Sequence, residues 1–97
     1  MKKFKVFVNG KNCLISVENG SPIKHGFYTT VFVEAANAEQ AESAAVNLLK
    51  NDSQLRDALE NENTDPPRVF IESIEEIHSF EGCKLPRVGL AWFVEGT

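Results

Sequence analysis

The chain has 97 residues, 42% of them hydrophobic, and a formal net charge of −4, which predicts a single α+β domain spanning residues 1–97 with a core that needs no metal or disulfide. No apolar run approaches the 18 residues of a membrane-spanning helix, and early lysines interrupt any signal-peptide core, so a cytoplasmic location without membrane association is expected. The charge is uneven: residues 1–24 carry five lysines against one glutamate, whereas residues 34–81 carry twelve acids against three bases.

The first quarter of the chain predicts two short strands joined by a tight turn. Phe4, Val6 and Val8 alternate with other residues, which predicts a strand that buries these three side chains. Asn9-Gly10 follows, and because both residues tolerate positive φ, a hairpin turn is expected there. Residues 13–17 would then form the returning strand, and a second turn at 19–22 would lead into a third strand over 27–33.

An alanine-rich helix is predicted after the third strand. Alanines at three- and four-residue spacing predict a helix over 38–50, with Ala45 packed against the sheet. Asn37 is positioned as the N-cap, and Gln40 completes a capping box. A short second helix is expected over 54–59, and the prolines at 66–67 end the polar loop that follows.

The C-terminal third predicts two more strands. Alternation slips within residues 68–80, and a bulge near Ser73 would return the isoleucines to one face. Residues 82–87 are expected to form a loop and residues 90–94 a final strand. The predicted fold is α+β, with a five-stranded antiparallel or mixed sheet in the order βββα(α)ββ and both helices on one face. The strands that flank the helices should be parallel.

Helices on one face leave aromatic side chains on the other. Phe7, Tyr28, Phe32 and Phe93 are surplus to a core on the helix side, so we expect them to form a homodimer interface. The leading hypothesis is a non-enzymatic interaction or regulatory module. The acidic middle segment fits either a basic partner or a solubilising surface. Nucleic acid binding is not expected, because the lysines do not appear as a cluster interleaved with exposed aromatics.

The sequence also allows two functions other than an interaction module. A small-ligand-binding domain of ferredoxin-like type would use a pocket between the sheet and the 81–89 loop. A cysteine-dependent enzyme would use Cys83 with His78, which lie five residues apart, although no oxyanion loop or orienting group is evident. Cys13 and Cys83 are expected to be free thiols. The histidines and cysteines lack paired spacing and no glycine-rich phosphate loop occurs, so neither a metal nor a cofactor is expected.

Four local motifs carry a resemblance to a known family. They are GFYTTVFVEA at 26–35, the A-x-x-A helix that follows, Asp65-Pro66-Pro67, and IEEI at 74–77. Together they resemble a family of small uncharacterised bacterial proteins with a GFYTTxFVEA strand-helix motif, and the likeness covers residues 6–95 in outline. The resemblance implies no catalytic residues. The strand-helix-strand-strand half also resembles ferredoxin-like domains, which is a likeness of fold only.

Overall fold

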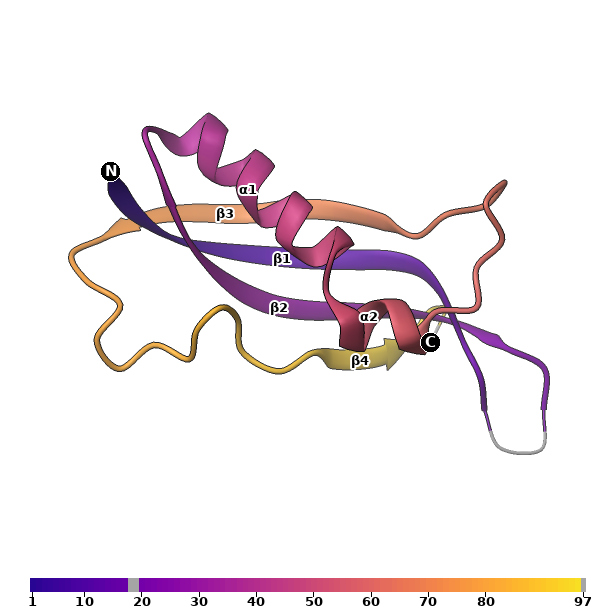
Figure 1. The fold of residues 1–97 in the computed structure, drawn as a ribbon. Coiled ribbons are helices and arrows are strands. Elements are labelled where there is room, and N and C mark those ends of the chain that lie inside the picture. The colour runs from indigo at the N-terminus through magenta and orange to yellow at the C-terminus, as the bar shows by residue number, and fades with distance from the viewer. Residues whose placement is uncertain (18–19, 97) are drawn as a thin grey trace.

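The computed structural model describes residues 1–17 and 20–96, and within them four strands and two helices form the fold. The sheet has the order β3-β1-β2-β4, and every neighbouring pair is antiparallel. Both helices lie against the same face of this sheet (Figure 1). In chain order the elements are β1 (Lys2–Ile15), β2 (Ile23–Ala35), α1 (Ala38–Lys50), α2 (Ser53–Ala58), β3 (Arg68–Ile77) and β4 (Ala91–Val94).

The α+β class is correct, but the predicted five-stranded, partly ferredoxin-like sheet is wrong, because the first two expected strands are one. β1 runs straight through Asn9-Gly10. A Cβ atom at Gly10 would lie 1.9 Å from the ring of Phe27, which is 1% exposed. Glycine therefore makes room for a buried ring from the neighbouring strand, and its freedom is not used for a turn. The positive φ occurs instead at Asn12, at 59°, within a bulge.

The reversal between β1 and β2 lies between Ile15 and Ile23. The turn expected at 19–22 falls in this connection, and its first residue, Asn19, lies outside the described residues. β2 and β3 are both antiparallel to β1, so they run in the same direction, as expected. They are not neighbours, however, since β1 lies between them and forms the centre of the sheet.

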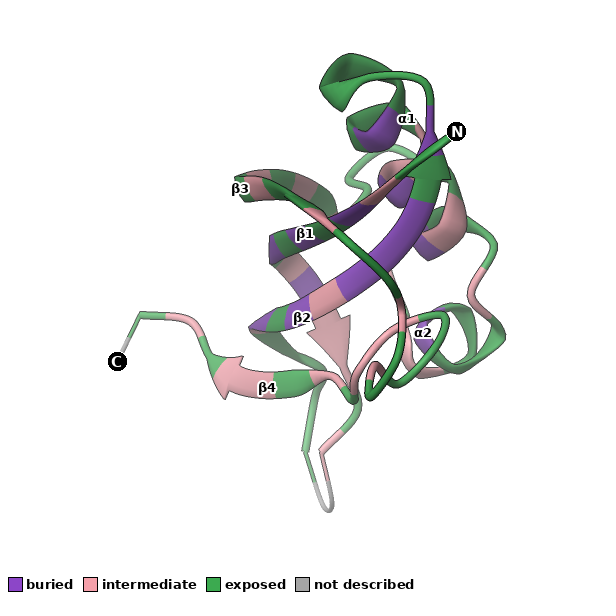
Figure 2. Ribbon diagram, turned by 90° about the vertical axis from the view of Figure 1, so that its left-hand side faces the viewer, coloured by how far each residue is buried: buried purple, intermediate pink, exposed green. Residues whose placement is uncertain are grey.

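The core lies between the sheet and α1. Phe4, Val6 and Val8 are buried as the alternation predicted, and Ala45 on α1 is fully buried against them. The predicted helix start is also confirmed, because the side chain of Asn37 accepts a hydrogen bond from the Gln40 backbone N–H at 2.9 Å. Figure 2 shows the buried residues along β1, β2 and the inner side of α1.

The edge strands differ in how well the sequence predicted them. The expected bulge is confirmed: the β1–β3 register passes from Phe7 opposite Ser73 to Val8 opposite Ile71. At the other edge, β4 pairs only with residues 25–28 of β2. Residues 86–88, which follow a cis Leu85–Pro86 bond, continue this edge through hydrogen bonds from Phe32 N–H to the Pro86 carbonyl and from Val88 N–H to the Thr30 carbonyl.

Candidate functional site

The sheet face opposite the helices carries a row of three aromatic rings, those of Phe7, Tyr28 and Phe93. This face is called the open face. In the described part of the chain no helix covers it (Figure 2). The Phe7 and Tyr28 rings stack with centroids 5.4 Å apart, and Tyr28 contacts Phe93 at the same distance. Phe7 is 38% exposed and Tyr28 is 39% exposed. The row thus crosses β1, β2 and β4 and presents an apolar stripe to solvent.

Charged side chains alternate with the aromatics along β1. Lys3, Lys5, Phe7 and Lys11 occupy alternate positions on the open face, and the Lys11 ammonium lies 5.4 Å from the centroid of Phe70. On the open face, lysines and aromatic side chains therefore do alternate, contrary to what the sequence suggested when nucleic acid binding was not expected. β3 adds the opposite sign, because Glu75 lies directly across from Lys5.

Phe32 does not belong to the exposed row. It is only 9% exposed, and Phe80 from the loop after β3 packs against it edge-on with centroids 6.3 Å apart. Lys3 in turn lies 5.8 Å from the Phe80 centroid. Of the four aromatics predicted to form an interface, Phe7 and Tyr28 are the most exposed, Phe93 is half-buried, and Phe32 is covered by the chain's own loop.

Asn9 lies at the centre of the open face, between Tyr28 on β2 and Phe70 on β3 in the register. It is 6% exposed, and its side-chain amide donates to Glu72 at 3.3 Å. Its Oδ1 atom has no hydrogen-bond partner among the described residues. A buried acceptor left unpaired costs about 1 to 3 kcal/mol, and asparagine has a low strand propensity. Packing within the sheet therefore does not explain why an asparagine occupies this buried position.

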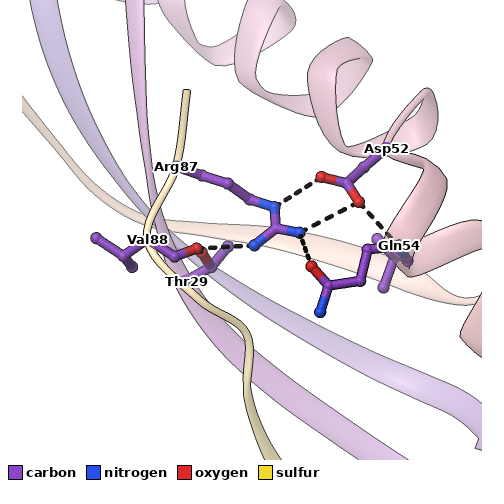
Figure 3. Close-up of polar contacts among 6 residues, drawn as sticks. Thr29, Asp52, Gln54, Arg87 and Val88 are labelled. Carbon is purple, nitrogen blue, oxygen red and sulfur yellow. Dashed lines mark hydrogen bonds and ion pairs between the residues drawn. The ribbon is translucent and has the colours of Figure 1, made fainter. Parts of the chain in front are cut away.

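A second polar cluster was not anticipated from the sequence (Figure 3). Arg87, in the loop before β4, forms a two-pronged ion pair with Asp52, with nitrogen–oxygen distances of 2.7 and 3.2 Å. It also donates to Gln54 and to the Val88 carbonyl, which Thr29 binds as well. The Arg87 hydrogen bonds hold the pKa of Asp52 below its usual value, because they stabilise the carboxylate.

This cluster occupies the place where a ligand pocket was expected. A hollow of about 290 Å³ beside the 81–89 loop is lined by Asp52, Gln54, Lys84, Pro86, Arg87 and Gly89. The charged groups of Asp52 and Arg87 are already paired with each other there. Within the described residues this loop therefore binds to the start of α2, and it leaves few free polar groups for a ligand.

The candidate cysteine chemistry finds no assembled site in the described residues. Cys83 is half-buried and His78 is exposed, and neither a hydrogen bond nor a ring contact joins them. Both cysteines are free, as expected. Burial, with a smaller contribution from Glu95, raises the pKa of the Cys13 thiol to about 11, which disfavours its reactive thiolate. No group of three or more His, Cys, Asp or Glu residues in the described ranges could hold a metal ion.

Comparisons of the chain with protein-family models, with curated proteins and with solved structures gave no match. The resemblance to the small bacterial family therefore stays a prediction. Among the described helices, none is long and apolar enough to cross a membrane.

Proposed function

We propose that the protein is a non-enzymatic interaction module and that its open face binds a second copy of the chain. The observation that carries this proposal is the exposed aromatic row of Phe7, Tyr28 and Phe93. Burying a large apolar side chain contributes about 1.5 to 3 kcal/mol. A partner that covers this row would recover that free energy, and exposed apolar patches mark interaction sites in soluble proteins.

The charge pattern favours a second copy over a partner of one sign. The open face carries Lys5 and Lys11 together with Glu72 and Glu75. In a twofold dimer the same surface meets itself, so a face that holds both signs can be self-complementary. A twofold axis that passes between Lys5 and Glu75, which lie opposite each other on β1 and β3, would bring Lys5 of one subunit near Glu75 of the partner subunit. A purely polyanionic partner fits less well, because the glutamates would repel it.

The test is the mass in solution across a dilution series, measured by light scattering. The parent chain should approach twice 10.8 kDa at high concentration, and Phe7→Lys or Tyr28→Lys should return it to the monomer. Ile23→Lys is the matched control, because Ile23 is 41% exposed and lies on β2 in the register that faces the helices. It should leave the mass unchanged.

A monomer at every concentration would refute the self-association proposal. The same samples should then be titrated with a fluorescent single-stranded oligonucleotide, because aromatics interleaved with lysines also suit stacked bases. Saturable binding that Phe7→Lys abolishes would assign the open face to nucleic acid and not to a second copy.

The cysteine-enzyme hypothesis has a separate test. Cys83 is half-buried, whereas Cys13 is fully buried, so alkylation is measured at Cys83. An ordinary alkylation rate for Cys83 at neutral pH would remove the chemical basis of that hypothesis, since a cysteine nucleophile needs an activated thiolate.

A further inference from the structure

A cavity in the described chain lies on the helix side of the sheet, and none of the aromatic row of Phe7, Tyr28 and Phe93 lines it. It has a volume of about 580 Å³, opens to solvent, and is lined by residues of α1, α2, the prolines before β3, and β3 itself. Its apolar lining includes Phe27, Leu49 and Leu55, each at most 5% exposed. Pockets of 300 to 1,000 Å³ with apolar walls are typical small-molecule sites.

The charges around this cavity have one sign. Lys50, Arg56 and Arg68 line it, and none of its other lining residues is acidic. These three are all the bases of residues 34–81, a segment that also holds twelve acids. None of the three is in an ion pair within the described part, where the pairs join Lys2 to Glu76 and Arg87 to Asp52.

Helix electrostatics account for only part of this arrangement. Lys50 and Arg56 lie in the last turns of α1 and α2, where a helix dipole favours bases. Each helix end contributes about half a negative charge at most, so three cations leave the cavity positive by about two charges. The dipoles also give no reason for the absence of acids from the lining.

We propose that this cavity binds an amphipathic carboxylate, a free acid with an unbranched hydrocarbon tail. The tail would occupy the apolar space above Leu49 and Leu55, and the carboxylate would remain near the lysine and arginines at the boundary with solvent. A neutral apolar ligand would leave the cations unused, and a small inorganic anion would leave the apolar volume unfilled. The inference does not depend on the proposed dimer, because none of Phe7, Tyr28 and Phe93 lines this cavity.

Calorimetric titration with decanoate, kept in its monomeric concentration range, tests the proposal. Binding should saturate at one site per chain. Affinity should rise about fourfold per added methylene from hexanoate to decanoate, as expected for a CH₂ group transferred from water. Decanol, which has the tail without the charge, should bind at least fivefold more weakly.

Two variants test whether the basic side chains around the cavity contribute to decanoate binding. Lys50→Gln and Arg56→Gln change exposed side chains and should each weaken decanoate binding about two- to fivefold, the range for partly solvated ion pairs. Lys84→Gln is the matched control, an exposed lysine that does not line this cavity, and should leave the affinity unchanged. Thermal unfolding of each variant confirms that it is folded.

Three results would overturn the proposal. One is no saturable decanoate binding, another is equal affinity for decanol, and the third is an equal loss in Lys84→Gln. Phosphatidylglycerol vesicles are the last probe, because an anionic bilayer also combines hydrocarbon tails with negative charges. Sedimentation with vesicles in the absence of decanoate binding would assign the cations to a membrane surface and would also overturn the proposal.

Discussion

Asp52 carries two structural roles through one carboxylate. Its Oδ1 accepts the Leu55 backbone N–H at 3.0 Å and so caps α2, while the carboxylate also binds the guanidinium of Arg87. The two side chains are only 13% and 8% exposed. Because the pair is largely shielded from water, it fixes the 81–89 loop against α2, and losing either partner would leave a poorly solvated charge.

The first prediction concerns this pair and its pH dependence. Asp52→Asn keeps a good N-cap residue but removes the charge, so it should lower the free energy of unfolding at pH 7 by about 3 kcal/mol, the low end for breaking a buried pair. In the parent the folded-state pKa of Asp52 is lowered. Its contribution is therefore complete above the unfolded value of about 3.9 and is lost as the pH falls below about 4.

Urea unfolding from pH 7 to pH 3 measures both effects. Asp57→Asn is the control, because Asp57 is an exposed aspartate on the same helix. It should stay within about 0.5 kcal/mol of the parent, as surface substitutions usually do. If Asp52→Asn and the parent lost stability in parallel below pH 4, the ion pair would not be the source of the acid sensitivity.

At the scale of elements, the features that depend on residues close together in the sequence are predicted correctly. The Asn37 cap depends on Gln40, three residues away, and the β3 bulge follows from the spacing of Ile71 and Ile74. The Asn9-Gly10 turn was predicted wrongly because the decisive contact comes from Phe27, in another strand. Dipeptide propensity carries no information about a ring 17 residues later.

The second prediction tests that explanation. Gly10→Ala should lower the free energy of unfolding by at least about 1 to 3 kcal/mol, the cost of overpacking a core, because its Cβ would overlap the Phe27 ring. Gly89→Ala should be near neutral, since nothing lies within 4 Å of the Cβ position there. Chemical denaturation of both variants gives the comparison.

A double-mutant cycle separates the ring contact from a backbone effect. In a Phe27→Ala background the additional cost of Gly10→Ala should largely disappear, because the clashing ring is gone. An undiminished cost there would mean that Gly10 is required for its backbone conformation and that the Phe27 ring is not the reason for a glycine in β1.

At the scale of the whole molecule, the sheet separates two different surfaces. The aromatic row on the open face could be predicted in part, because strand alternation places Phe7, Tyr28 and Phe93 on one side. The cavity could not, because Lys50, Arg56 and the segment that begins β3 converge on it only through tertiary packing. The Asp52–Arg87 pair, 35 residues apart in sequence, was missed for the same reason.

The last prediction concerns how the stability of the whole chain depends on concentration. If the folded protein is a dimer and the unfolded chain is not, the melting temperature must rise with protein concentration. A tenfold increase adds about 1.4 kcal/mol per dimer, or about 0.7 kcal/mol per chain. For a chain of this size 1 kcal/mol shifts the melting temperature by about 4 to 8 °C, so a shift of about 3 to 6 °C per tenfold increase in concentration is expected. Phe7→Lys should abolish this dependence and Ile23→Lys should retain it.

Calorimetric scans over a hundredfold range of protein concentration measure this dependence. A constant melting temperature would show that the aromatic row is exposed in a stable monomer, and the open face would then need a partner other than a second copy of the chain.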